Sequence, residues 1–189
     1  MTKGYVDLNE NKKTDWVTPP DTLALLLQLG RLTLDVCTRE DNHLNADQFY
    51  TPRVNGLAQS WLPLGGGLSY CNHPWSRQDT PAWVARACDE GERLHREGRS
   101  SNELVVLGPA RPDTAWFRKL WLSADVVYFW KGRITFIDPD TGKPAVDKKG
   151  NSSPVPVPVH VSYWGVRPQT FIDVFTQQGG CYHAAEAPF

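Results

Sequence analysis

The stretch that decides the fold is Leu68-Ser69-Tyr70-Cys71-Asn72-His73-Pro74-Trp75-Ser76, an apolar run that leads directly into a polar turn with a proline. A short apolar run bounded by turn residues predicts a buried strand. In an open α/β sheet, ligands bind outside the carboxyl ends of the strands. We therefore interpret the turn that follows this strand as a candidate active site.

The side chains of this turn suit the recognition of a flat polar group. Asn72 offers an accepting side-chain oxygen, and Pro74 favours an extended conformation of His73, whose carbonyl is a second acceptor. Trp75 offers a stacking face. Two acceptors beside an aromatic ring match the exocyclic amino group of a nucleobase. The alternative is an ordinary turn, because Asn and Pro are common turn residues.

Length and composition argue against a membrane protein and a metalloprotein. The chain has 189 residues, and we expect a single domain over residues 1–189. No apolar run approaches the length of a membrane span and no charged leader precedes one, so we expect a cytoplasmic protein without a membrane partner. The four cysteines form no CxxC pair and the five histidines are scattered, which predicts no metal site. A formal net charge of −1 allows nucleic acid binding through a local basic patch.

A second buried strand is predicted over residues 32–37, with Asp35 near its carboxyl end. A carboxylate at such a position commonly accepts hydrogen bonds from a ribose or an amino group. No Gly-x-Gly-x-x-Gly follows, which counts against a dinucleotide site, and an exposed turn residue is the alternative for Asp35. If the two strands are neighbours, Asp35 and Asn72 lie at one edge of the sheet, where one could hold a cofactor and the other a substrate.

Strands and helices alternate along the remaining chain. Helices are predicted after Asp21 and Asp113 as N-caps, over residues 80–98, and from Pro168. Further strands are predicted over residues 103–107, 125–130 and 132–136, and over the alternating run from Val155 to Val161, which should begin at a sheet edge or outside the ladder because it contains Pro156 and Pro158. We expect residues 1–13 to be loosely ordered and residues 138–154 to form a mobile loop. This order predicts an α/β fold with a mostly parallel, doubly wound sheet.

The motifs, taken in order, resemble the DNA N-6-adenine methyltransferase family that is common in phages and prophages. They are Trp16-x-Thr18-Pro19, Leu34-Asp35-Val36-Cys37 with Asn45, Phe49-Tyr50-Thr51, Asn55-Gly56-Leu57, Trp61, the turn Cys71 to Ser76, Trp83-Val84, Pro109-Ala110-Arg111, Asp113 to Phe117, and Gly132-Arg133-Ile134-x-Phe136. No single motif is specific, whereas the ordered set is. The resemblance implies a Rossmann-like methyltransferase fold that uses S-adenosylmethionine, yields S-adenosylhomocysteine and needs no metal.

The resemblance also implies site residues. The catalytic residues would be Asn72, His73, Pro74 and Trp75, in the place of the family's Asn-Pro-Pro-Tyr motif. The cofactor would contact Trp16, Thr18, Pro19, Asp35, Cys37, Asn45, Leu57 and Asn72. DNA would contact Ser76, Arg77, Arg111, Arg133, Lys148 and Lys149. His73 loses the backbone restraint of the family's proline and adds a titratable ring, whereas Trp75 preserves stacking.

The implied function is transfer of a methyl group from S-adenosylmethionine to the exocyclic amino group of a flipped adenine in DNA, by a monomer or homodimer in the host cytoplasm if the chain is phage-encoded. His73 motivates an alternative from another class, an inactive methyltransferase fold that binds DNA or protein as an anti-restriction phage accessory. A third possibility is a transferase that places a different group on adenine. The mass added to the nucleoside would distinguish these.

Overall fold

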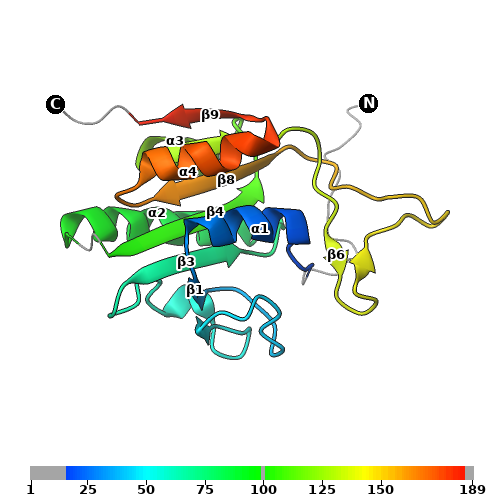
Figure 1. Ribbon diagram of the computed structural model, residues 1–189, viewed down its shortest axis with the longest axis horizontal. Coiled ribbons are helices and arrows are strands. Elements are labelled where there is room, and N and C mark those ends of the chain that lie inside the picture. The colour runs from blue at the N-terminus through cyan, green and yellow to red at the C-terminus, as the bar shows by residue number, and fades with distance from the viewer. Residues whose placement is uncertain (1–15, 99–100, 186–189) are drawn as a thin grey trace.

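The computed structural model describes residues 16–98 and 101–185, in which helices cover both faces of a seven-stranded sheet (Figure 1). The segment 1–13, for which we expect loose order, lies outside the described residues. The strands of the sheet are β1 (Leu32–Asp35), β2 (Gln48–Phe49), β3 (Gly67–Asn72), β4 (Asn102–Pro109), β5 (Val126–Phe129), β8 (Val159–Trp164) and β9 (Cys181–Ala184). The helices are α1 (Pro20–Leu29), α2 (Thr80–Arg96), α3 (Ala115–Ser123) and α4 (Pro168–Phe175), with short 3₁₀ turns η1 (Gly56–Ala58) and η2 (Thr176–Gln178).

The sheet is mixed, with strand order β2-β1-β3-β4-β8-β5-β9. Strands β2, β1, β3 and β4 are parallel neighbours, whereas β8 is antiparallel to both β4 and β5, and β9 is antiparallel to β5. Because β5 is antiparallel to β8, it runs in the same direction as β4, so five of the seven strands are parallel as predicted and only β8 and β9 run against them. A parallel neighbour needs a crossover connection, usually a helix, and no helix lies between β5 and β8 in the described chain. The Rossmann-like class stays a prediction.

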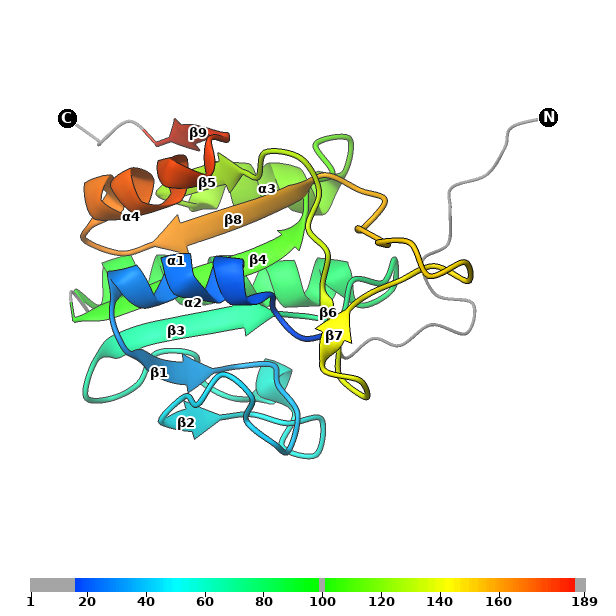
Figure 2. The same ribbon diagram turned by 45° about the vertical axis from the view of Figure 1, so that its right-hand side comes forward.

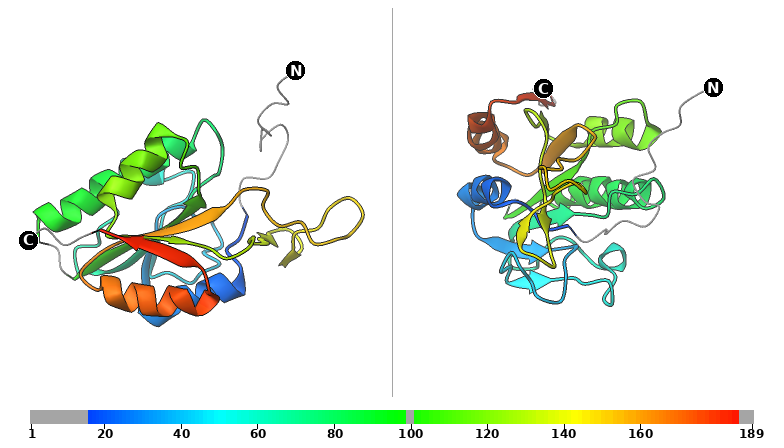
Figure 3. Two further views of the ribbon diagram at one scale, coloured as in Figure 1. Left: turned by 90° about the horizontal axis from the view of Figure 1, so that it is seen from above. Right: turned by 90° about the vertical axis from the view of Figure 1, so that its right-hand side faces the viewer.

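Helices α1 and α4 pack on one face of the sheet, and α2 and α3 pack on the other (Figure 3). The predicted helix over residues 80–98 is present as α2, and its sheet-facing side is buried at Trp83, Val84, Ala87, Cys88, Gly91 and Leu94. Gly91 allows a close approach, because a methyl group built on it would lie 2.2 Å from Trp164 of β8. Each face thus has its own apolar core, and β4 is buried along its whole length between them.

Three local predictions are wrong. Asp21 lies inside the first turn of α1, whose N-cap is Pro19. Thr114 caps α3 by accepting a hydrogen bond from the Phe117 N–H (3.3 Å), because the carboxylate of Asp113 is already bound by Arg111. Residues 132–136 form no strand, since the backbone hydrogen bonds to Ile134 and Phe136 come from separate partners instead of one ladder.

Residues 133–155, which we call the arm, extend past the edge of the sheet at which β1, β3 and β4 end (Figure 2). We call this edge the carboxyl edge. Inside the arm, β6 (Ile137–Asp138) pairs with β7 (Lys143–Pro144). Mobility of residues 138–154 stays a prediction. Strand β8 begins at Val159, so the predicted run starts four residues later than Val155, and both prolines lie outside the ladder, one of the two places expected for them. Among the described residues, no helix combines the length and apolar composition that a membrane span requires.

Candidate active site

Asn72 is the last residue of β3, and a polar network at the carboxyl edge holds it. Its Nδ2 donates to the Thr18 hydroxyl (3.3 Å) and to the Trp16 carbonyl (3.4 Å). The Thr18 hydroxyl is also hydrogen-bonded to the Tyr70 hydroxyl (3.0 Å). Tyr70 and Asn72 share one face of β3 because side chains alternate along a strand. The fold thus brings Trp16 and Thr18 next to Asn72, although Trp16 and Asn72 are 56 residues apart in the sequence.

This network fixes the orientation of the Asn72 amide. The Trp16 carbonyl can only accept a hydrogen bond, so the NH₂ group of Asn72 must face it. The Oδ1 atom therefore points away from Trp16, and it makes no hydrogen bond to any residue that the structure describes. Asn72 thus carries a preoriented acceptor at the carboxyl edge.

The His73 imidazole lies on the opposite face of the sheet from the Asn72 amide. Its Nδ1 donates to the Pro74 carbonyl (2.9 Å), and the ring stacks on Trp83 of α2 with ring centroids 6.3 Å apart. Burial lowers the pKa of His73 to about 4, so the ring is neutral at pH 7. The structure thus directs the imidazole into the core, and only the backbone carbonyl of His73 is suited to a role beside Asn72.

Trp75 is half-buried and contacts the base of the arm. Its ring packs edge-to-face on Phe136, with centroids 5.1 Å apart. The next residue, Ile137, exchanges two backbone hydrogen bonds with Val17 (3.0 and 3.1 Å). Because Trp16 and Thr18 flank Val17, the arm is joined to both the Trp75 ring and the Asn72 network.

Asp35 ends β1, which pairs with β3 in parallel, so its predicted position next to the Asn72 strand is confirmed. Burial raises the pKa of Asp35 to about 7, although the Cys37 N–H donates to its carboxylate (3.2 Å). Burial and the nearby Asp35 raise the pKa of the Cys37 thiol to about 12. At neutral pH, therefore, the Cys37 thiol is protonated and Asp35 is about half ionised.

The other residues with a predicted cofactor role are spread over three segments. Pro19 precedes α1 and is half-buried. Asn45 is exposed, with a positive φ of 52°, and Leu57 packs from η1 against the α2 side of the sheet. Neither Asn45 nor Leu57 is hydrogen-bonded to the Asn72 network in the described chain. Of the residues with a predicted cofactor role, Trp16 and Thr18 are therefore hydrogen-bonded to Asn72, whereas Asn45 and Leu57 are not.

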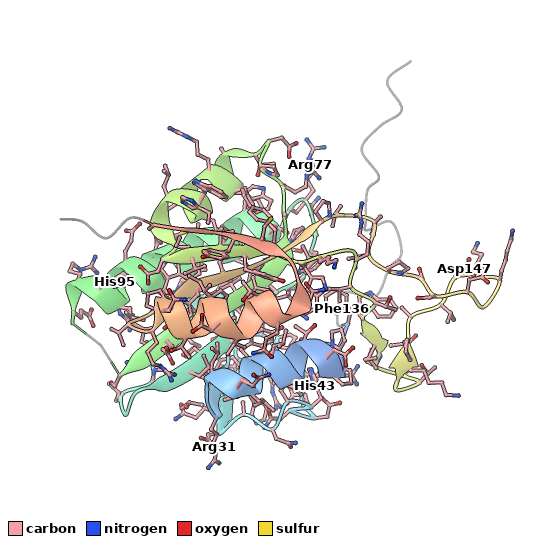
Figure 4. The ribbon with its side chains drawn as sticks, turned by 45° about the horizontal axis from the view of Figure 1, so that its top comes forward. Arg31, His43, Arg77, His95, Phe136 and Asp147 are labelled. Carbon is pink, nitrogen blue, oxygen red and sulfur yellow. The ribbon has the colours of Figure 1, made fainter. Side chains whose placement is uncertain are left out.

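The residues predicted to contact DNA fall into two groups. Ser76 is buried, donating to the Asp79 carboxylate (2.5 Å) and accepting from the Asp79 N–H (2.8 Å), and Arg111 pairs with Asp113. Four others are exposed: Arg77, Arg133, Lys148 and Lys149. In Figure 4, Arg77, Phe136 and Asp147 lie toward one side of the molecule, and Arg31 and His95 toward the other. Arg77 follows Trp75 by two residues, and the other three belong to the arm, whose Phe136 contacts the Trp75 ring.

One family model matches residues 6–158, and its description is DNA N-6-adenine-methyltransferase (Dam). The chain belongs to this Dam family. A search of curated proteins finds no match. The Dam match covers most of the chain, including the Asn72 network, the turn and the whole arm. At the level of the Dam family, the protein is an enzyme, its substrate is DNA and its reaction is methylation of adenine at N6.

Sequence reasoning missed two residues of the site, Tyr70 and Ile137. Tyr70 could have been found, because it lies two residues before Asn72 and so on the same face of the strand. Ile137 could not, because its pairing with Val17 joins segments 120 residues apart. Phe136 belongs to one of the sequence motifs, but the motif does not indicate what the residue does. The structure shows that its ring contacts the Trp75 ring.

Proposed function

We propose that the protein transfers the methyl group of S-adenosylmethionine to N6 of an adenine that is flipped out of DNA, and that the turn Asn72-His73-Pro74-Trp75 holds the base. The observation that carries this proposal is the Asn72 Oδ1 atom, which the Thr18 and Trp16 contacts of the amide nitrogen leave oriented and without a partner in the described chain. An adenine amino group presents two N–H bonds and needs two acceptors, which Asn72 Oδ1 and the His73 carbonyl supply.

These two acceptors also favour the reaction. The lone pair of N6 is delocalised into the adenine ring, so positive charge develops on the nitrogen as it becomes a nucleophile. Fixed acceptors stabilise this charge without reorganisation during the reaction. Proton loss can follow methyl transfer and go to water. Trp75 stacks on the flipped base and replaces part of the stacking lost from the duplex, and Phe136 keeps its ring in place.

The residues of the carboxyl edge fit S-adenosylmethionine. Its ribose hydroxyls and amino group need acceptors, and the buried Asp35 carboxylate is one at the end of the strand next to β3. When bound there, the cofactor supplies an electrophilic methyl group on a sulfonium. Thr18 and Trp16 contribute by holding Asn72, with Pro19, Cys37, Asn45 and Leu57 as the remaining proposed contacts. Arg77, Arg111, Arg133, Lys148 and Lys149 are proposed to contact DNA phosphates, and sequence readout is assigned to the arm.

The test is to incubate the purified protein with unmethylated DNA and S-adenosylmethionine, digest the DNA and measure nucleosides by mass spectrometry. The wild type should produce N6-methyladenine, and Asn72→Ala should lower the rate by about 100-fold or more, the usual cost of removing one preorganised hydrogen-bonding group. Calorimetry should show that Asn72→Ala still binds S-adenosylmethionine.

Gln169→Ala is the matched control, because Gln169 is an exposed amide at the start of α4, near the opposite edge of the sheet. It should methylate at the wild-type rate. Equal rates for Asn72→Ala and the wild type would remove Asn72 from its role. Cofactor binding without any modified nucleoside in the wild-type sample would contradict the proposed activity.

A further inference from the structure

Two buried histidines from different strands meet at Gly108. Gly108 of β4 is paired with His160 of β8, and His73 directly follows β3 on the other side of β4. A methyl group built on Gly108 would lie 2.7 Å from His160 Nε2 and 3.3 Å from His73 Nε2. Both imidazoles therefore turn the same ring nitrogen toward one point beside Gly108, on the α2/α3 face of the sheet.

The opposite ring nitrogens fix where the protons lie. His73 Nδ1 contacts the Pro74 carbonyl (2.9 Å), which only accepts, so Nδ1 carries the proton and Nε2 a lone pair. His160 Nδ1 contacts the buried Ser162 hydroxyl (2.8 Å), which has no other side-chain partner in the described chain. The hydroxyl hydrogen needs an acceptor, so Ser162 donates to Nδ1 and His160 carries its proton on Nε2. One Nε2 atom thus accepts and the other donates.

Neither Nε2 atom has a hydrogen-bond partner among the described residues, although both are buried. The surrounding walls are aromatic, because Trp83 stacks on His73 and Phe117 packs edge-on against His160 with centroids 5.4 Å apart. Buried polar atoms without partners are costly, and an ordered water with two or more polar partners is the usual solution. A metal ion is disfavoured, since protein metal sites use three or four ligands and no group of three candidate ligands occurs in the described chain.

We propose that His160 is a positioning residue for methyl transfer, which holds the catalytic turn through one water molecule bound between His160 Nε2 and His73 Nε2. The hydrogen bonds then run in one direction. Ser162 donates to His160, His160 to the water, the water to His73, and His73 to the Pro74 carbonyl. The chain ends on the backbone of the turn whose His73 carbonyl receives the adenine amino group. This role rests on the proposed function.

Two variants of nearly equal size separate positioning from packing. His160→Gln keeps an N–H donor near the position of Nε2, whereas His160→Leu fills the site without any donor. We expect His160→Leu to lower kcat by about 10-fold, the effect of losing one ordinary hydrogen bond, with KM for DNA and for S-adenosylmethionine unchanged. His160→Gln should stay near the wild-type rate. Equal rates for the two variants would overturn the proposal.

Gly108→Ala and a double-mutant cycle give independent checks. The alanine methyl would crowd both Nε2 atoms and displace the water, so Gly108→Ala should lose kcat as His160→Leu does. In a His73→Ala background, which removes the imidazole but retains the carbonyl, His160→Leu should cause no further loss. Losses that multiply independently in the double variant would show that the two histidines do not act through each other.

The proton positions can be read in the wild type without turnover, which matters if His160→Leu does not fold. Nitrogen-15 chemical shifts of the imidazoles should show His73 protonated on Nδ1 and His160 on Nε2. The opposite tautomer at His73, or one metal ion per chain by elemental analysis, would overturn the water-linked pair. Absence of methyl transfer by the wild type would contradict the proposed function instead, and the tautomers measured in the same sample keep the two failures distinct.

Discussion

At the scale of single residues, Asp35 gives the sharpest test of the cofactor site. Burial raises the pKa of its carboxyl to about 7. If the ionised carboxylate accepts hydrogen bonds from S-adenosylmethionine, binding should tighten by about 10-fold between pH 6 and pH 8, because the ionised fraction rises by that factor. Calorimetric dissociation constants over this range would measure the effect. Above pH 8, the contribution of Asp35 should be constant.

Asp35→Asn is the matched control for this titration. It keeps the shape of the side chain and removes the ionisation, while the amino group of the ligand titrates in both proteins alike. Asp35→Asn should bind S-adenosylmethionine more weakly than the wild type at pH 8. Its affinity should also lack the 10-fold increase between pH 6 and pH 8 that is expected for the wild type. The same pH profile in both proteins would exclude Asp35 from the cofactor site.

Residues of one strand and its turn could be predicted, whereas residues that meet across strands could not. The positions of Asn72 and Asp35 follow from two apolar runs that end in polar residues, and Tyr70 follows from alternation along β3. The meeting of His73 with His160 depends on the register between β4 and β8, which pairs Gly108 with His160. No local pattern in the sequence encodes that register, so His160 could be found only in the folded chain.

At the scale of elements, the arm combines two tasks at its two ends. Its base contacts the catalytic turn through Phe136 and Trp75 and pairs with the segment before α1 through Ile137 and Val17. Its outer turn, where Asp147 accepts backbone hydrogen bonds from Lys149 and Asn151, exposes two lysines. We therefore expect the outer turn to affect DNA affinity and the base to affect catalysis.

Variants at the two ends should separate these effects. The double change of Lys148 and Lys149 to Ala should raise KM for DNA at unchanged kcat and reduce the slope of log KM against log salt by about 1 for each phosphate that is no longer neutralised. Phe136→Ala should lower kcat instead, because Trp75 then lacks the ring that holds it. Steady-state kinetics at several salt concentrations would measure both.

Arg31→Ala is the control for the lysine variant. Arg31 is an exposed cation that precedes β1, on the other side of the molecule from Asp147 (Figure 4). Its removal should leave KM and the salt slope unchanged. A lysine variant indistinguishable from Arg31→Ala would show that the outer turn does not bind DNA.

At the scale of the whole molecule, the helices on both faces of a sheet were predictable, but the direction of β8 and β9 was not. Apolar periodicity gives the four helices and the strands β1, β3, β4, β5 and β8 in the right order, but it adds a strand over residues 132–136 that does not form and it misses β9. Of the two places expected for Pro156 and Pro158, a sheet edge or outside the ladder, the second is observed. Strand direction depends on the route of the chain between β5 and β8. There the arm leaves and returns at the carboxyl edge, so β8 must run back antiparallel to β4. A run of short polar and glycine-containing segments does not specify that return.

The buried titratable groups also give the whole molecule a characteristic pH dependence of stability. Burial lowers the pKa of His73 to about 4 and of His160 to about 3, so between pH 4 and 6.5 the unfolded chain binds these protons and the folded chain does not. Their contribution to stability therefore rises with pH over this range. Asp35 opposes them, because its raised pKa makes the folded chain bind the extra proton, so its contribution falls as pH rises from about 4 to about 7. The two histidines together should change the free energy of unfolding more than Asp35 does, so the net stability should rise with pH.

Urea unfolding without cofactor, measured between pH 4.5 and pH 6.5, would test this balance. The wild type should become more stable as pH rises. His160→Leu should flatten the profile, because one histidine and Asp35 then nearly cancel, and Asp35→Asn should steepen it, because the opposing group is gone. If both variants shift the profile in the same direction, the three side chains do not titrate as buried groups of the folded protein. The two variants should therefore change the slope of stability against pH in opposite directions. This result would test the burial of His160 and of Asp35 in one experiment, without relying on methyl transfer.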